Sequence, residues 1–168
     1  MRPLILALCA LPSLLTPVFA QSDLGALPAQ IGEIFCIARL ADDPDLLDGL
    51  LSDELRTQIA YAEARNDSLA RAFPDDKPPL GDGIPWASFP DRAETCTLGS
   101  VATEGATARV VVTYGFRSDP AAEFADTLEL VQRPHPYDPD RGQWRLNDIR
   151  YTTSGTLREA LHTLFEGL

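Results

Sequence analysis

The sequence has few of the side chains that catalytic and metal-binding sites most often use. Its 168 residues include two histidines, three cysteines, one methionine and a single lysine, Lys77. Basic residues are also scarce, because 14 Lys plus Arg face 25 Asp plus Glu and the formal net charge is −11. No basic stripe offsets this charge, so binding to nucleic-acid phosphates or to anionic lipid surfaces is not expected.

The two histidines are poorly placed for nucleophilic catalysis. A Ser–His–Asp or Cys–His site needs a histidine base that a third group orients. His135 stands between two prolines in a predicted turn, and His162 falls on a predicted C-terminal helix. The sequence therefore predicts no catalytic residue of this kind.

Residues 1–20 have the pattern of a secretory signal peptide. An almost wholly apolar run ends in Val18–Ala20, which predicts cleavage before Gln21. The alternative is an uncleaved anchor, but the run is shorter than the ~20 residues of a membrane span, and Pro12 and Pro17 interrupt it. We expect residues 21–168 to form a single domain that is periplasmic or secreted.

Cleavage would leave two cysteines in the mature chain, Cys36 and Cys96. Exported compartments are oxidising, so these two cysteines are predicted to form a disulfide. Loop-closure entropy gives such a bridge up to about 4 kcal/mol of stabilisation. The alternative is a pair of separately buried thiols, and metal binding would need more ligands than two distant cysteines supply.

Helical spacing of apolar residues predicts three helices before residue 74. The first carries Cys36, the second is a short amphipathic turn at residues 46–51, and the third is capped by Ser52 or Asp53 and runs towards Phe73. Residues 74–92 then contain five prolines and two glycines, which predict a long irregular loop.

From residue 93 onward the hydrophobic period changes to two, which predicts strands. The predicted strands are Thr95–Val101, Thr107–Arg117, Phe124–Arg133 and Gln143–Tyr151, with a long hairpin connection at residues 134–142. Thr156 has the spacing of a capping box and opens a closing helix.

The last strand contains a phase slip, because Trp144 and Leu146 occupy even positions whereas Ile149 and Tyr151 occupy odd ones. One extra residue, a β-bulge near Asn147–Asp148, would return both pairs to the core face and bend the strand. The predicted fold is therefore α+β. N-terminal helices pack on a curved four-stranded antiparallel sheet, a C-terminal helix closes it, and the whole is cone-like.

Two acidic residues are candidates for a polar pocket. Asp126 and Asp148 each interrupt a strand whose neighbours have a buried pattern, and paired carboxylates can perform acid–base chemistry. Pairing with Arg145 or Arg109 is the alternative. The acidic clusters at residues 42–48 and 138–142 do not match a calcium loop and are interpreted as turns and caps, so no metal and no cofactor is predicted.

The loop at residues 74–92 is the remaining candidate site. Lys77, Trp86 and Phe89 are predicted to form a lip for a ligand or partner at the open end of the curved sheet. The alternative is a structural plug in which Trp86 fills the edge of the core.

A resemblance to a known superfamily rests on two segments. Residues 77–83 in the loop, and the strand 144–149 followed by Leu157-Arg158, resemble small exported bacterial domains of uncharacterised function. These belong to the cone-shaped α+β superfamily named for nuclear transport factor two, and the resemblance covers roughly Ile31 to Leu164. It implies a cone fold. Members include isomerases, dehydratases, immunity proteins and binding domains, and the His–Asp and Tyr–Asp pairs of its enzymes have no clear match here.

The sequence thus favours an exported, disulfide-bonded, non-catalytic domain that binds an unidentified protein or small molecule. One rival is an acidic inhibitor or immunity factor, because a net charge near −12 after cleavage would steer it towards a basic secreted hydrolase. A second rival is a small-molecule isomerase or lyase that uses the cone. It would require an open pocket that contains a carboxylate.

Overall fold

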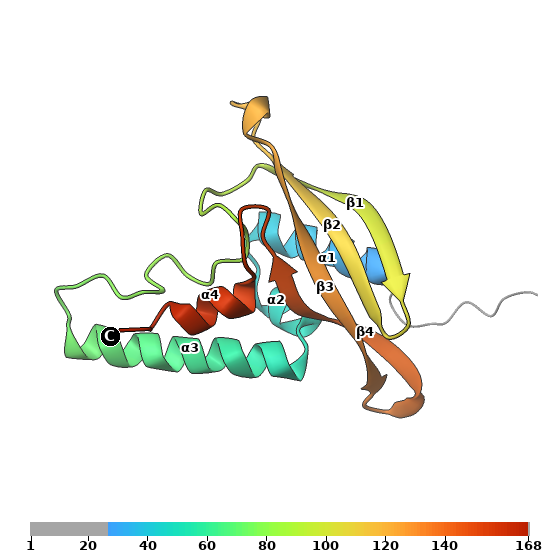
Figure 1. The fold of residues 1–168 in the computed structure, drawn as a ribbon, viewed down its shortest axis with the longest axis horizontal. Helices are drawn as coiled ribbons and strands as arrows, with labels where there is room; N and C mark the ends of the chain where they lie inside the picture. Colours follow the sequence, from blue (N-terminus) through green and yellow to red (C-terminus); the bar gives the residue numbers. More distant parts are fainter. Residues whose placement is uncertain (1–26, 168) are drawn as a thin grey trace, which may run out of the picture.

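The computed structural model describes residues 27–167, apart from the side chains of residues 139 and 140, and shows an α+β fold (Figure 1). The predicted signal segment, residues 1–20, lies outside the described residues. The helices are α1 (Pro28–Ala41), α2 (Pro44–Leu50), α3 (Asp53–Ala72) and α4 (Leu157–Thr163), with a 3₁₀ turn at Pro120–Ala122. The strands are β1 (Thr95–Glu104), β2 (Thr107–Gly115), β3 (Phe124–His135) and β4 (Asp138–Arg150).

Side-chain caps fix where the helices begin. The Ser52 hydroxyl accepts the Leu55 N–H at 3.1 Å and starts α3, and Thr156 accepts the Glu159 N–H at 3.3 Å and starts α4. Asp43, in the acidic cluster that the sequence interprets as turn and cap chemistry, accepts the Leu46 N–H at 2.9 Å and starts α2.

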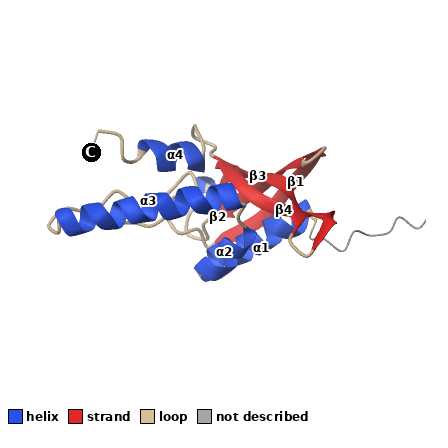
Figure 2. Ribbon diagram, turned by 90° about the horizontal axis from the view of Figure 1, so that it is seen from below, coloured by secondary structure: helices blue, strands red, loops and turns tan. Residues whose placement is uncertain are grey.

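The four strands form one antiparallel sheet in the order β1-β2-β3-β4, and the helices bury one of its faces. Figure 2 shows the strong twist of the sheet, with α1 and α2 beneath it and α3 and α4 extending from one side. α1 lies against β1 and β2, whereas α3 and α4 contact β4. The approach of α1 is close, since a Cβ on Gly32 would lie 2.5 Å from Leu98 Cδ1.

The predicted β-bulge in β4 is confirmed. Glu129 pairs with Asp148 and the next residue, Leu130, pairs with Leu146, so Asn147 is the extra residue. Leu146 and Ile149 consequently both point into the core and are fully buried. The bulge lets one strand place side chains from both even- and odd-numbered positions on the core face.

The predicted long connection between β3 and β4 is wrong. The pairing continues through Pro134 and Gly142, and only Pro136 and Tyr137 form the turn. Pro134 is tolerated because β2 ends its pairing with β3 at Val131, so the proline has β4 as its sole neighbour there. The prolines and glycine that suggested a loop therefore lie in a two-stranded extension of the sheet.

The predicted disulfide is confirmed. Cys36 of α1 and Cys96 of β1 are bonded, with their Cα atoms 5.2 Å apart. The predicted irregular loop is also confirmed, because residues 73–94 contain no helix and no strand before β1 begins. Figure 1 shows this segment running from the far end of α3 back to the start of β1. Among the described residues, no helix is long and apolar enough to cross a membrane.

Candidate functional site

The second half of the loop is hydrogen-bonded to the end of the sheet where β3 begins and β4 ends. The Ser88 N–H donates to Asp126 Oδ2 at 2.8 Å, and the Ser88 hydroxyl donates to Asp126 Oδ1. The Tyr151 hydroxyl donates to the Pro85 carbonyl. The Leu80 N–H, nearer the start of the loop, donates to Asn66 Oδ1 of α3 at 2.7 Å. The loop is thus docked on the body of the protein along its length, and Arg92 adds a bond to the Leu40 carbonyl at 3.1 Å.

Asp126 is the buried anchor of this docking. Its side chain is 1% exposed, and Oδ1 also accepts the Thr152 N–H at 3.0 Å. Both carboxylate oxygens are therefore occupied by donors of the loop and of the β4–α4 connection. The expected alternative, a pair with Arg145 or Arg109, does not form in the described part of the chain.

Asp148 has a different structural role. Its Oδ1 accepts the Ile149 N–H at 2.8 Å and the Arg158 N–H at 3.1 Å, which joins the β4 bulge to the first turn of α4. Next to it, Asn147 Oδ1 accepts the Ser52 hydroxyl at 3.0 Å. Arg158 Nε donates to Gln58 Oε1 at 3.0 Å. We call this set, Ser52, Gln58, Asn147, Asp148 and Arg158, the junction.

The two candidate carboxylates are therefore not brought together. Asp126 holds the loop, Asp148 belongs to the junction, and neither lines any of the cavities described below. The strand-and-helix motif that carries the superfamily resemblance contributes Asn147, Asp148 and Arg158 to the junction, which links α3, β4 and α4.

A cavity of about 250 Å³ lies between the docked loop and the end of α1, and we call it the mouth cavity. Trp86 and Phe89 of the predicted lip line it, together with Ile84. The rest of its lining is Arg39, Asp42, Pro44, Leu47, Asp82, Gly83 and Pro90. Trp86 is half-buried and Phe89 is 44% exposed, so the loop presents aromatic surface both to the cavity and to solvent.

The half-buried Arg39 lines the mouth cavity, and its guanidinium lies near the buried hydroxyl of Tyr114, which is not a lining residue. By strict geometry, neither Arg39 Nε nor the Tyr114 hydroxyl makes a hydrogen bond in the described residues. Arg39 also forms no ion pair there. Burial and the Asp126 charge raise the pKa of Tyr114 above its usual value, and the nearby Arg39 guanidinium opposes that rise. A phenolic oxygen can accept as well as donate, so the Arg39 guanidinium is placed to donate a side-chain hydrogen bond to Tyr114.

An aromatic contact links Tyr114 to the cavity wall. The Tyr114 ring stacks on Phe124 with centroids 4.9 Å apart, and Phe124 meets Phe89 edge-on at 4.8 Å. Tyr114 pairs with Cys96 across the sheet, and Cys36 lies three residues before Arg39 on α1. The disulfide therefore joins α1, which carries Arg39, to β1, the strand that pairs with β2 at Tyr114.

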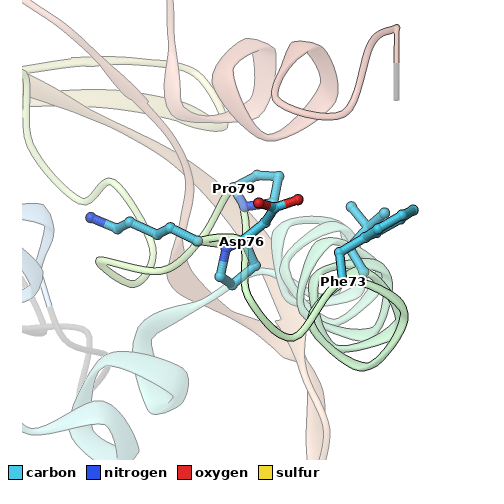
Figure 3. Close-up of a pocket in the computed structure, with 6 residues that line it drawn as sticks. Phe73, Asp76 and Pro79 are labelled. Carbon is cyan, nitrogen blue, oxygen red and sulfur yellow. The ribbon is translucent and has the colours of Figure 1, made fainter.

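The third residue of the predicted lip lies elsewhere. Lys77 forms an ion pair with Asp82 at 2.6 Å and lines a separate, largely apolar pocket at the end of α3. Figure 3 shows this pocket, with Phe73 on the helix side and Pro79 on the loop side. Lys77 thus contributes to a different cavity from Trp86 and Phe89.

A second surface lies on the outer side of Phe89. Phe89, Phe116 and Phe124 line a cleft of about 630 Å³ whose remaining lining includes Asp91, Glu94, Asp119 and one cation, Arg92. We call it the aromatic cleft. Its apolar rings and acidic margin suit a basic or amphipathic partner.

Sequence reasoning did not single out Arg39 or Tyr114. Arg39 belongs to the first predicted helix and Tyr114 to the second predicted strand, and neither falls in a recognisable motif. One signal was present, since a tyrosine among valines on a core face needs a partner for its hydroxyl.

No protein-family model, curated protein or solved structure matches the chain. Within residues 27–167 there is no group of three or more His, Cys, Asp or Glu side chains that could hold a metal ion.

Proposed function

We propose that the protein is an exported, non-catalytic binding domain whose ligand occupies the mouth cavity. The observation that carries this proposal is the mouth cavity itself, where Arg39, which forms no ion pair within the described residues, stands beside walls formed by Trp86 and Phe89. Binding sites typically combine apolar and aromatic walls with a few convergent polar groups. The Cys36–Cys96 disulfide is compatible with an oxidising, extracytoplasmic location.

Membership of the superfamily named for nuclear transport factor two remains part of this proposal. An antiparallel sheet with a bulge in β4 and helices packed on one face supports it, and so does the irregular loop at residues 73–94. The rival isomerase or lyase receives no such support, because Asp126 and Asp148 are engaged by backbone and hydroxyl donors and line none of the described cavities.

Trp86 makes the proposal testable by fluorescence. The sequence has two tryptophans, so a Trp144→Phe background leaves Trp86 as the sole reporter. Three probes that share a phenyl ring but differ in charge are titrated: benzyl alcohol, phenylacetate and phenethylamine. At least one is expected to change the Trp86 emission in a saturable way.

A matched pair of variants locates the binding. Ile84→Phe places extra volume in the wall of the mouth cavity and is expected to abolish the response. Ile37→Phe makes the same change at an exposed position of α1 and is expected to leave it intact. If none of the three probes binds, or if Ile84→Phe binds as well as Ile37→Phe, the mouth cavity is not the binding site.

The acidic-inhibitor alternative is favoured by one separate observation, the acidic margin of the aromatic cleft. Basic secreted hydrolases would be retained on the immobilised protein at low salt and released at high salt, since exposed charge pairs are screened. Phe116→Ser should reduce this retention, and Phe73→Ser, at the pocket on α3, should not. If the retained amount of hydrolase changes neither with salt nor with Phe116→Ser, this alternative is excluded.

A further inference from the structure

We infer that the aromatic cleft is a second binding site and that its ligand is a small organic cation whose nitrogen carries methyl groups. Three phenylalanine rings and three carboxylates line this cleft, the carboxylates being Asp91, Glu94 and Asp119. The inference does not depend on the proposed function, because the cleft and the mouth cavity share only Phe89 in their linings.

The hydrogen bonds that dock the loop also bring the rings of the cleft together. Ser88 is bonded to Asp126 through its N–H and its hydroxyl, and Asp126 lies two positions after Phe124 on β3. The next loop residue, Phe89, lies against Phe124 with ring centroids 4.8 Å apart and ring planes at 69°. Phe116, which directly follows β2, has its centroid 6.3 Å from that of Phe124. Rings from three segments thus form the walls of one concave site.

The charges around the cleft favour a cation. Asp91 and Asp119 form no ion pair in the described part of the chain, whereas Glu94 pairs with Arg117 at 3.9 Å. The cation in the lining, Arg92, donates to a backbone carbonyl of α1 at 3.1 Å and pairs with none of the three carboxylates. A bound cation is therefore attracted both by carboxylates and by the negative faces of the rings, and an anion would be repelled by both.

The walls also favour methyl groups on the nitrogen of that cation. A bare ammonium ion is strongly hydrated and carries N–H donors that need acceptors, which phenyl rings supply poorly. Two of the carboxylates already accept backbone N–H groups, Glu94 from Arg117 at 2.8 Å and Asp119 from Ala121 at 3.1 Å. A methylated nitrogen has fewer or no N–H groups to satisfy, keeps its charge and packs its methyl groups on the rings.

The extent of the cleft favours a small molecule over a protein. Its volume of about 630 Å³ lies within the ~300–1,000 Å³ of typical small-molecule sites, and nine residues line it. A standard protein interface takes roughly 20–30 residues from each side. A basic protein bound at the same place is the competing outcome of the experiment.

Choline and 3,3-dimethylbutanol are the deciding probes, because they have one shape and differ in the charge of one central atom. In calorimetric titrations of the disulfide-bonded protein, choline is expected to bind about tenfold more tightly than the alcohol. Ethanolamine, whose ammonium carries no methyl groups, is expected to bind about fivefold more weakly than choline. The inference is overturned if either compound binds as tightly as choline. It is also overturned if choline does not bind, and retention of a basic hydrolase through Phe116 would then make the cleft a protein-binding surface.

A matched pair of ring variants locates the cation. Phe116→Leu keeps an apolar side chain but removes a ring, so it is expected to weaken choline binding about fivefold. Phe73→Leu makes the same change at the pocket on α3 and should have no effect. Ile84→Phe, which narrows the mouth cavity, should leave choline binding intact, so the two sites fail or stand separately.

A second pair of variants tests the charge without disturbing the fold. Asp91 is exposed and has no hydrogen bond in the described residues, so Asp91→Asn is expected to weaken choline binding about threefold and to leave binding of the alcohol unchanged. Asp67→Asn, at an exposed position of α3, removes the same charge elsewhere and should change neither. Unchanged choline affinity in both Phe116→Leu and Asp91→Asn would overturn the inference.

Discussion

The junction and the mouth cavity both contain polar side chains, but those of the junction are hydrogen-bonded to other elements, whereas Arg39 of the mouth cavity forms no ion pair in the described residues. Ser52, Asn147 and Asp148 each bond to a partner on another element, which locks α3, β4 and α4 together. At the mouth cavity, Arg39 Nε makes no hydrogen bond of good geometry in the described residues, although the guanidinium lies near the Tyr114 hydroxyl. A satisfied buried network stabilises one arrangement, whereas unsatisfied donors lower stability unless something else accepts from them.

Reduction of the Cys36–Cys96 disulfide should have the largest effect on this contrast. The bridge joins α1 to β1 and spans 60 residues of chain, so its loss should lower the free energy of unfolding by up to about 4 kcal/mol. Urea unfolding of the Cys36→Ser/Cys96→Ser variant measures this. Amide exchange should accelerate more at Tyr114 than at Arg158, and equal acceleration would mean that the bridge supports both regions alike.

The two buried aspartates should respond differently to the same substitution. Asp126 accepts through both oxygens, so in Asp126→Asn the amide NH₂ must face a backbone N–H in either orientation, at a cost of about 2–3 kcal/mol. Asp148 accepts through Oδ1 alone, so Asp148→Asn keeps both bonds and should cost about 0.5 kcal/mol from the lost charge. Thermal and urea unfolding compare the two, and equal losses would contradict this reading of Asp126.

Alkaline pH should lower the free energy of unfolding through Tyr114 and Tyr151. Burial raises the pKa of Tyr114 and of Tyr151 above the ordinary value of 10. The folded chain therefore keeps phenolic protons that the unfolded chain loses above about pH 10, and stability falls as the pH rises. Each tyrosine contributes a slope of at most about 1.4 kcal/mol per pH unit, and the half-exposed Tyr151 contributes less than Tyr114 because solvent screens it. Urea unfolding at pH 9, 10 and 11 measures the slope, and Tyr151→Phe should reduce it. A slope that Tyr151→Phe leaves unchanged would exclude Tyr151 as a source.

The smallest effect is expected at the Tyr114 hydroxyl. Tyr114→Phe removes a polar atom that makes no hydrogen bond of good geometry, so the free energy of unfolding should change by no more than about 0.5 kcal/mol, or rise. Ser52→Ala at the junction removes a helix cap and a bond to Asn147 and should cost about 1–2 kcal/mol. A larger loss for Tyr114→Phe than for Ser52→Ala would show that Tyr114 is already satisfied within the fold.

The fold was largely predictable because its signals are local. The parity change between Leu146 and Ile149 predicts the bulge at Asn147, and two cysteines in an exported chain predict their own pairing. The β3–β4 connection was not predictable in the same way, since Pro134 and Gly142 are turn-forming residues in most contexts. They lie in strands here because their pairing extends beyond β2.

The candidate site was predictable only in part, because it depends on contacts between distant segments. Trp86 and Phe89 stand out as aromatic residues in a proline-rich loop, and the structure places both on one cavity. Arg39 and Tyr114 come from a helix and a strand that the sequence describes separately. The sequence predicts Asp126 as a pocket residue. Its carboxylate is instead hydrogen-bonded by Ser88, which is 38 residues away in the chain.

The position of the disulfide has a consequence for proteolysis. Residues 73–94 are the longest irregular segment among the described residues, and they lie between Cys36 and Cys96 in the chain. A protease that cuts this segment once would leave two fragments still joined by a covalent bond. The nicked protein would migrate as one species without reductant and as two with it, and the strands that follow Cys96 would stay attached to α1.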